Sequence, residues 1–279
     1  MVKLFNKINL SAVLALLSLN VMNSTLIADD CCYYPTCNRL YIGVFGGETY
    51  SNRAKIRQTG VAFFTEALGG PLAIDARGHS KKKSSGFGGV QIGYEWSQSQ
   101  ACCCSNWSFA PAAELEAFFY RHNHKAHLIN PTIRLSEHDF RDSFRTDVGV
   151  YLLNGVLSIN NCCFRSLSPY IGGGIGAANL RLRKAKSFQV EPPELGVNHF
   201  NSKREDTDWA FAAQAKAGLR YNFCERFHIF AEYRLVFVDT NKFNLGSTVY
   251  PNHAPTTTWN VDVKRQWFNS WAIGIQFDL

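Results

Sequence analysis

Carboxylates and histidines are the residues of this 279-residue chain whose types and spacing could carry chemistry. Glu114 and Glu116 stand two residues apart, and two neighbouring carboxylates can share general acid–base catalysis. His122 and His124 have the same spacing, with His127 close by, and could hold a metal ion at the surface. Residues two apart share one face of any extended segment, however, and no nucleophile accompanies either pair. The pattern therefore favours neither an enzyme nor a metal or cofactor site.

The nine cysteines are a second group with reactive side chains, and most stand in clusters. They are Cys31, Cys32, Cys37, Cys102, Cys103, Cys104, Cys162, Cys163 and Cys224. Zinc ligation is one hypothesis, but the spacings match no zinc-finger pattern. Disulfide bonds within the chain, which would staple one end of the fold, are a second hypothesis, and bonds to other proteins are a third; adjacent cysteines seldom bond to each other. An odd number leaves at least one thiol free or bonded to another protein.

The first 28 residues have the pattern of a secretory signal peptide. Lys3 and Lys7 precede an apolar run over residues 10–21, which is too short for a spanning helix. Leu26 and Ala28 stand at cleavage positions before Asp29. Export places the cysteines in an oxidising compartment, where disulfides persist. We therefore expect a signal peptide (1–28), a Cys-rich periplasmic segment (29–38) and one folded domain (39–279).

Apolar and polar residues alternate with period two in the folded domain, which predicts strands. In AFAAQAKAGLRYNF (residues 210–223), Phe211 and Leu219 share one face, while Lys216 and Arg220 share the other. Eight segments follow this pattern: 39–50, 86–96, 107–120, 145–159, 169–182, 210–223, 227–237 and 267–279. Most reach the roughly 9–11 residues that a tilted strand needs to cross a bilayer.

The connections between these segments alternate between short and long. The short ones are 97–106, 160–168 and 224–226, and the long ones are 51–85, 121–144, 183–207 and 238–265. This asymmetry predicts an all-β fold: an eight-stranded antiparallel transmembrane β-barrel with short periplasmic turns and long extracellular loops. A soluble sandwich or lipocalin would bury its apolar face, whereas here the other face carries charge. On this topology all nine cysteines fall on the periplasmic side.

Three short motifs give this prediction a family resemblance. YIGGGIGAANLRL, AKAGLRYNF and FAEYRL resemble the fifth to seventh strands of the small OmpA-like and Opa-like eight-stranded outer-membrane barrels. The likeness is one of pattern and covers most of the chain after the signal peptide. It implies the outer membrane of a Gram-negative-type bacterium, with roles in envelope integrity or adhesion to a host surface.

The polar faces of the strands would line the barrel interior, and they carry both signs of charge. The residues concerned are Glu95, Glu114, Glu116, Lys216, Arg220, Glu232 and Arg234. The interior of an eight-stranded barrel is just wide enough to be filled by side chains. Because buried charges must be paired, we expect a structural network of ion pairs in the lumen. An ion-conducting path is the alternative.

Basic residues gather where the strands meet the long loops, and they are candidates to contact lipopolysaccharide phosphates through charge-assisted pairs. They are Lys81, Lys82, Lys83, Arg181, Arg183, Lys184, Lys264 and Arg265. Solvated loop charge is the alternative, and the net charge of +7 does not indicate a nucleic acid partner. Trp107, Trp209, Trp267 and Tyr120 are candidates for aromatic girdles at the membrane interfaces.

Three functions are compatible with these patterns. The first is a structural and interaction barrel, tied through disulfides to other Cys-containing envelope proteins and contacting the outside through its loops. The second is a small porin-like channel, which a filled lumen opposes. The third is an outer-membrane lipid-modifying enzyme, which needs a Ser–His pair near one rim. Ser168 and Ser270 have no obvious histidine partner, and only Ser143, near His138, is available. The sequence favours the first function, without catalysis or cofactor.

Overall fold

The computed structural model describes residues 38–96, 107–131, 138–161, 166–224 and 226–279. The predicted signal peptide, all but the last residue of the Cys-rich segment, and every cysteine except Cys224 lie outside these ranges. No helix within the described ranges is long and apolar enough to cross a membrane.

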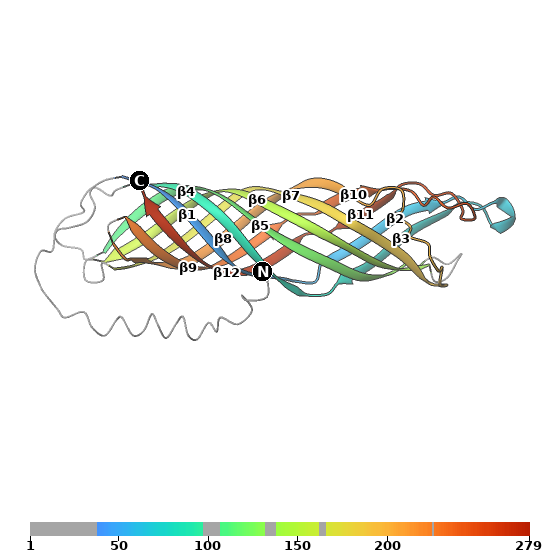
Figure 1. Ribbon diagram of the computed structural model, residues 1–279, viewed down its shortest axis with the longest axis horizontal. Coiled ribbons are helices and arrows are strands. Elements are labelled where there is room, and N and C mark those ends of the chain that lie inside the picture. Colours follow the sequence, from blue (N-terminus) through green and yellow to red (C-terminus); the bar gives the residue numbers. More distant parts are fainter. Residues whose placement is uncertain (1–37, 97–106, 132–137, 162–165, 225) are drawn as a thin grey trace, which may run out of the picture. The chain divides into compact units, whose positions relative to one another are not determined.

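Eight antiparallel strands pair in a closed ring (Figure 1). In ring order they are β1 (Arg39–Ser51), β4 (Lys83–Glu95), β5 (Trp107–Ile129), β6 (Asp139–Asn161), β7 (Leu167–Glu191), β8 (Asp206–Asn222), β9 (Phe227–Val238) and β12 (Gln266–Asp278). The ring closes where β1 pairs with β12, from Tyr41 opposite Asp278 to Ser51 opposite Phe268. The predicted fold class is confirmed.

Three strands of the ring run much farther than predicted. β5 and β6 each have 23 residues and β7 has 25, so most of the predicted loop 121–144 and part of 183–207 are strand. The other long connections also contain structure: β2 (Lys55–Ala62), the 3-10 turn η2 (Glu66–Leu68), β3 (Leu72–Ser80), β10 (Asn241–Leu245) and β11 (Trp259–Val263). These connections were predicted only as long loops, and the strands within them form because these segments bury apolar side chains of their own.

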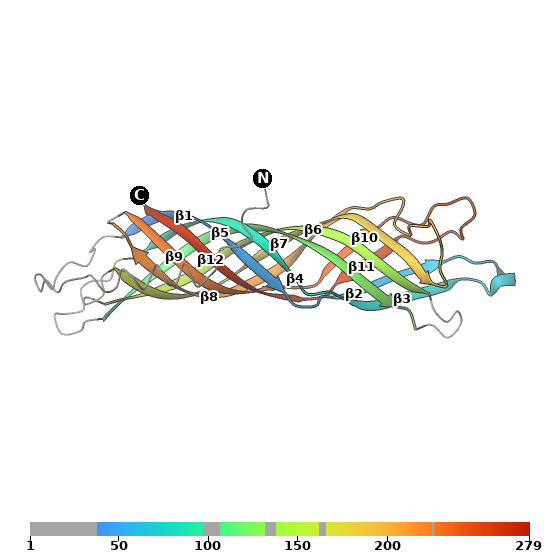
Figure 2. The same ribbon diagram turned by 60° about the horizontal axis from the view of Figure 1, so that its bottom comes forward.

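These extra segments build a second closed structure on one end of the ring, which we call the extension. It consists of β2, β3, β10, β11, the distal parts of β5 (121–129), β6 (139–145) and β7 (183–191), and the loops 192–205 and 246–258. Figure 2 shows β2, β3, β10 and β11 together at that end.

Strand pairing closes the extension on itself. β3 pairs with the distal part of β5, β2 pairs with β3, and β11 joins β2 to β10. On the other side the loop 192–205 lies between β7 and β10. His199 N donates to Ser187 O on β7 (2.9 Å), and Gly246 N, next to β10, donates to Lys203 O (2.9 Å). The distal strands are thus paired on both edges, which leaves few backbone groups of the extension exposed.

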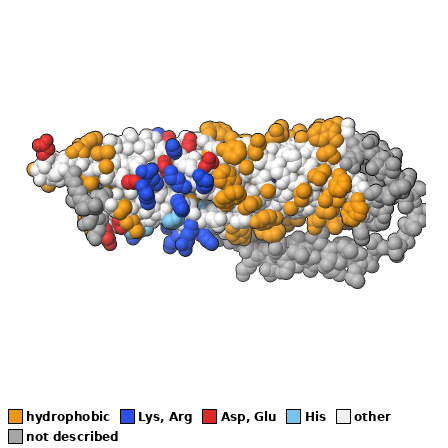
Figure 3. All heavy atoms as spheres, turned by 180° about the vertical axis from the view of Figure 1, so that it is seen from behind, with side chains coloured by type: hydrophobic (Ala, Val, Ile, Leu, Met, Phe, Trp, Pro, Cys, Tyr) orange, Lys and Arg blue, Asp and Glu red, His pale blue; other side chains and the backbone are white. Residues whose placement is uncertain are grey.

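The outer surface of the ring is apolar. Outward-facing residues include Val90 and Ile92 on β4, Leu115 on β5, Leu153 on β6 and Ile175 on β7, which are 44–63% exposed. Figure 3 shows hydrophobic side chains spread over this part of the molecule and absent from much of the charged part beside it. So many exposed apolar side chains are stable only in contact with lipid, since a soluble protein rarely exposes patches of this size.

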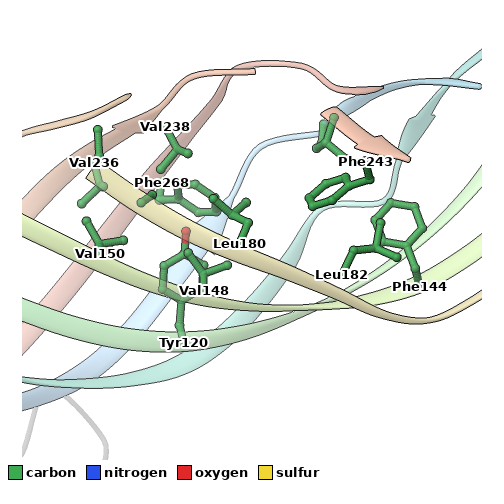
Figure 4. Packing of buried hydrophobic residues seen from close by; sticks show 14 of the residues in the cluster. Tyr120, Phe144, Val148, Val150, Leu180, Leu182, Val236, Val238, Phe243 and Phe268 are labelled. Carbon is green, nitrogen blue, oxygen red and sulfur yellow. The ribbon is translucent and has the colours of Figure 1, made fainter. Parts of the chain in front are cut away.

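The apolar core is continuous from the ring into the extension. Figure 4 shows Val148, Val150 and Leu180 packed with Phe268 inside the ring, and Leu182, Phe144 and Phe243 farther along. The core of the extension also contains Trp259, which is fully buried. The alternation with period two persists along the distal strands, so each strand supplies every second residue to this core.

Candidate functional site: the filled lumen and the charged rim

The charged residues predicted for the lumen all lie inside the ring and contact one another. Lys216, on β8, is the central cation, and its Nζ contacts Glu114 and lies 3.1 Å from an oxygen of Glu116. The carboxylate of Glu232, on β9, is 4.0 Å away. The amide of Asn154 donates to Glu114 and Glu116, both at 3.2 Å. These partners satisfy both carboxylates of the 114/116 pair, which leaves them no free role in acid–base chemistry.

Arg234, on β9, is the second central cation and is fully buried. Its guanidinium contacts the carboxylates of Glu116 and Glu232, so it links the two acidic strands. The same guanidinium lies over the ring of Phe45, 3.9 Å from the centroid, as a cation–π contact. Arg234 therefore joins the ion pairs to the apolar core above them.

A third set of ion pairs lies toward the short-turn end of the ring. Glu95 accepts from Arg220 at 2.9 Å and also contacts Arg39. Arg39 reaches Asp278 at 3.1 Å, and Asp278 lies 3.0 Å from His228 Nε2. Arg39, His228 and Asp278 were not predicted as lumen residues. The sequence could have shown them, because each stands at one of the alternate positions of its strand that face inward.

Two buried tyrosines complete the network, and glycines make room for them. Tyr41 Oη donates to Glu114 and Tyr170 Oη to Glu232, each at 2.9 Å. A Cβ on Gly93 would lie 2.2 Å from the Tyr41 ring, and one on Gly218 would lie 2.6 Å from the Tyr170 ring. Only glycine leaves space for these phenol groups.

The charges that the described residues place in the lumen nearly balance. Five carboxylates (Glu95, Glu114, Glu116, Glu232 and Asp278) face four cations (Arg39, Lys216, Arg220 and Arg234), with His228 as a tenth ionisable group. A cavity of about 20 Å³ lies beside Tyr41, Glu95 and Glu114, close to the space that one water molecule occupies. The side chains of the described residues therefore fill this part of the interior.

An apolar layer lies beyond the ion pairs, on the side of the extension. Phe45, Phe87 and Phe118 pack edge-on, with ring centroids 5.9–6.5 Å apart. The ring of Tyr120 lies next to that of Phe268, with the two centroids 5.2 Å apart. Tyr120 was predicted to lie in an outer aromatic girdle, and this is wrong. It occupies an inward position and is only 7% exposed, whereas Trp107, Trp209 and Trp267 face outward.

Basic residues lie on the outer surface just beyond the apolar belt, as Figure 3 shows. In register across β5, β6 and β7, Arg121 is opposite Asp147 and Asp147 is opposite Arg181. The next outward row contains Arg145 and Arg183. The belt residue Phe119 immediately precedes Arg121 on the outer face of β5. We call Arg121, Arg145, Asp147, Arg181, Arg183 and Glu205 the charged rim.

The charged rim is partly neutralised within itself. Asp147 accepts from Arg121 at 2.7 Å, from Arg145 at 3.2 Å and from Arg183 at 3.5 Å. Arg181 contacts Glu205 at 3.0 Å. The bound arginines hold the pKa of Asp147 below its usual value even though burial alone would raise it. Four arginines against two carboxylates leave the rim cationic.

The other basic candidates lie in the extension or where its strands join the ring. Lys81, Lys82, Lys83, Lys184 and Arg265 are exposed, while Lys264 is half-buried and pairs with Asp262 at 2.9 Å. Lys81 and Lys82 line, with Arg53 and His79, a surface pocket of about 390 Å³.

The histidine pair lies within the described structure, whereas of the nine cysteines only Cys224 does. The rings of His122 and His124 lie inside the extension, tilted by 54° with centroids 4.8 Å apart, and His122 Nε2 lies 2.9 Å from Ser51 Oγ. In the part of the chain that the structure describes, they belong to no group of three metal-ligating side chains. Cys224 is an exposed free thiol in the turn between β8 and β9. The other eight cysteines lie outside the described residues.

An eight-stranded antiparallel barrel with an apolar outer belt and a polar interior is an outer-membrane β-barrel. No protein-family model and no curated protein matches the sequence.

Solved structures that resemble the chain include three outer-membrane or surface proteins. Neisserial surface protein A has 9% identity and a TM-score of 0.40, covering 86% of this chain and 97% of its own. OprG from Pseudomonas aeruginosa has 13% identity and a TM-score of 0.41, covering 86% and 96%. The protease OmpT from Escherichia coli has 7% identity and a TM-score of 0.37, covering 89% and 99%. At these values the likeness adds nothing on function.

Proposed function

We propose that this protein is a closed outer-membrane barrel whose role lies in envelope structure and surface contacts. The observation that carries the proposal is the filled lumen. Arg234, Lys216 and their carboxylate partners occupy the centre of the ring, and the aromatic layer of Phe45, Phe87 and Phe118 covers them. A path for solutes would require these buried ion pairs to separate, which leaves charges without partners in a dry interior.

The extension supports a role in contacts outside the membrane. It is a folded body whose buried apolar side chains continue the core of the ring, and not a set of separate loops, so it presents a fixed surface. A rigid surface binds a partner with little loss of conformational entropy. The cationic rim next to the belt suits the phosphates of lipopolysaccharide, which bind arginine through charge-assisted hydrogen bonds.

The cysteines support a further part of the proposal. Exposed Cys224 lies in a short turn at the end of the barrel opposite the extension, and the sequence places the remaining cysteines in the segments at that same end. Disulfides to other Cys-containing envelope proteins would then anchor the barrel from the periplasmic side.

Conductance across a planar lipid bilayer tests the closed lumen. We expect no discrete current steps from the purified wild-type protein at neutral pH, because no continuous wet path crosses the ring. The matched variant Phe118→Ala with Phe268→Ala removes two rings of the apolar layer and keeps the ion pairs. It should also remain closed, since the ion pairs block the lumen by themselves. Stable current steps from the wild-type protein would refute the proposal and favour a porin-like channel.

A further inference from the structure

Two loops of the extension bring three metal-ligating side chains together. Glu194 and His199 come from the loop 192–205, and His253 comes from the loop 246–258. Their ligand atoms all lie within 4.8 Å of one another. Glu194 places one carboxylate oxygen 3.4 Å from His199 Nε2 and the other 3.5 Å from His253 Nε2. Neighbouring ligands of a tetrahedral ion with bonds of about 2.0–2.1 Å stand about 3.3 Å apart. Each histidine therefore has one of the two Glu194 carboxylate oxygens at a distance close to this spacing.

The hydrogen bonds of both histidines fix which nitrogen faces the cluster. Nδ1 of His199 lies 3.2 Å from Ser187 O, and Nδ1 of His253 lies 2.6 Å from Ala254 O. A carbonyl oxygen only accepts, so each Nδ1 carries a proton and each neutral ring presents the lone pair of Nε2. Metal-bound histidines in proteins have the same arrangement, with the second nitrogen donating to a backbone carbonyl.

Three acceptors that face one another favour a cation among them. His199 is only 3% exposed and packs edge-on against Phe140 and Trp259, with ring centroids 5.1 and 5.7 Å away, so its ring is held in place at the cluster.

Hydrogen bonds hold the two loops in place around the cluster. Asn198 N donates to Tyr250 Oη at 3.0 Å, and Thr248 Oγ1 donates to His199 O at 3.1 Å. Asn201 and Val249 exchange two hydrogen bonds, at 2.6 and 2.9 Å. The ligands are therefore oriented by the fold itself, which reduces the ordering that binding requires.

We propose that Glu194, His199 and His253 form a binding site for a divalent first-row transition-metal ion. Two imidazoles and one carboxylate are ligands that suit Zn²⁺, whereas Ca²⁺ and Mg²⁺ prefer sites built of oxygen alone. The three protein ligands leave a fourth position for water or for a group from a partner. Because the ligands come from two loops, the ion would also clamp these loops together.

Zinc titration of the purified protein tests this site. The protein is prepared without a histidine tag, stripped with a chelator, and alkylated at its thiols so that cysteine does not bind zinc. We expect one Zn²⁺ per chain by isothermal calorimetry, no binding of Ca²⁺, and a rise in thermal stability with zinc. The variant His253→Ala should weaken binding by at least about 100-fold, since loss of a ligand exceeds the usual effect of a supporting residue.

A matched control lies in the same extension. His127 pairs with the carboxylate of Asp139 at 3.3 Å without a second histidine, so His127→Ala should leave zinc binding unchanged. If His199→Ala does not fold, His253→Ala and Glu194→Gln still decide the matter, because these side chains are partly exposed. Absence of binding to the wild-type protein would overturn the proposal. Equal loss in His127→Ala and His253→Ala would do the same.

Discussion

The membrane-spanning ring and the extension share three strands, yet these strands carry opposite patterns in the two regions. On β5 the outward residues Leu115 and Phe119 are apolar within the belt, and the outward residues Arg121 and Lys125 are charged beyond it. The inward positions change in the opposite sense, from Glu114 and Glu116 in the ring to Ala126 and Leu128 in the extension. The parity of the strand does not change at this point.

This difference shows that the surrounding solvent, and not the backbone, decides which face is apolar. Lipid accepts apolar side chains on the outside of the ring, so the interior can hold polar groups that satisfy one another. Water surrounds the extension, so its apolar side chains must turn inward as in a soluble protein. One continuous strand meets both requirements by exchanging the character of its two faces.

Buried charge also differs between the two regions. In the ring each buried carboxylate has a cationic partner, as Glu116 has Lys216 and Arg234. In the extension Asp142 is fully buried, and its partners are Ser187 and the Gln58 amide, which lies 3.0 Å away in the orientation that satisfies its hydrogen bonds. Burial raises the pKa of Asp142 to about 7, although the Ser187 hydrogen bond lowers it in part.

Removing a paired charge from the ring should have the largest effect. Arg234→Ala removes the guanidinium that contacts both Glu116 and Glu232 and leaves Lys216 as the cation near these two buried carboxylates. We expect a loss of about 3–5 kcal/mol in the free energy of unfolding, measured by urea denaturation in detergent micelles. Arg181→Ala, at the exposed rim, should cost less than about 1 kcal/mol. Similar losses in both variants would mean that the lumen ion pairs do not stabilise the ring.

Removing the unpaired charge from the extension should have the opposite sign. The pKa of Asp142 is about 7 in the folded protein and about 3.8 when unfolded, so folding favours its protonated form. Its contribution to stability is complete below about pH 4 and is lost as the pH rises through about 7. Asp142→Asn has no charge that folding must bury. It should therefore raise the free energy of unfolding at pH 8 by up to about 4 kcal/mol.

The pH dependence and a second aspartate serve as controls for this result. Asp142→Asn and the wild type should have nearly equal stability at pH 4, where both side chains are neutral. Asp75→Asn lies in the same extension but removes an exposed carboxylate that pairs with Arg57 and Arg77, so it should not stabilise the protein. An unchanged urea midpoint for Asp142→Asn at pH 8 would show that Asp142 is not buried as a charged group.

Substituting outward-facing residues should give the smallest effects. These variants test whether lipid surrounds the ring and water surrounds the extension. Leu153→Arg places a charge in the middle of the belt, where Leu153 is 56% exposed to lipid, and should cost about 2–4 kcal/mol. Lys125→Leu makes the reverse change on the outer face of the extension, in water, and should alter stability by no more than about 0.5 kcal/mol. Folding in lipid vesicles measures both, and equal costs would mean that the belt does not contact lipid.

The ring could be predicted from the sequence because its alternation is strong. Lys216, Arg220, Glu232 and Arg234 stand at regular inward positions between apolar outward residues, and the structure brings them together. The extension could not be predicted in the same way. In RHNHKAHLI (121–129) the inward residues begin with His122 and His124, and the outward residues are polar, so the alternation of hydrophobicity nearly disappears.

The cluster of Glu194, His199 and His253 carries no local signal at all. His253 is far from the other two ligands in the sequence, and the two loops meet through hydrogen bonds such as those from Gly246 N to Lys203 O and from Thr248 Oγ1 to His199 O. A pattern search that looks for close spacing finds His122, His124 and His127 instead. Sites between loops depend on tertiary pairing, which spacing does not encode.

Closure by the first and last strands of each structure fixes the order of events during biogenesis. In the ring, β1 can complete its pairing only when β12 is present, and in the extension β2 can do so only when β11 is present. Because β10 and β11 precede β12 in the chain, this hairpin must reach the far side of the membrane before the ring can shut. Once the ion pairs assemble, nothing of the size of a polypeptide passes through the interior. Export of the extension must therefore precede sealing of the wall.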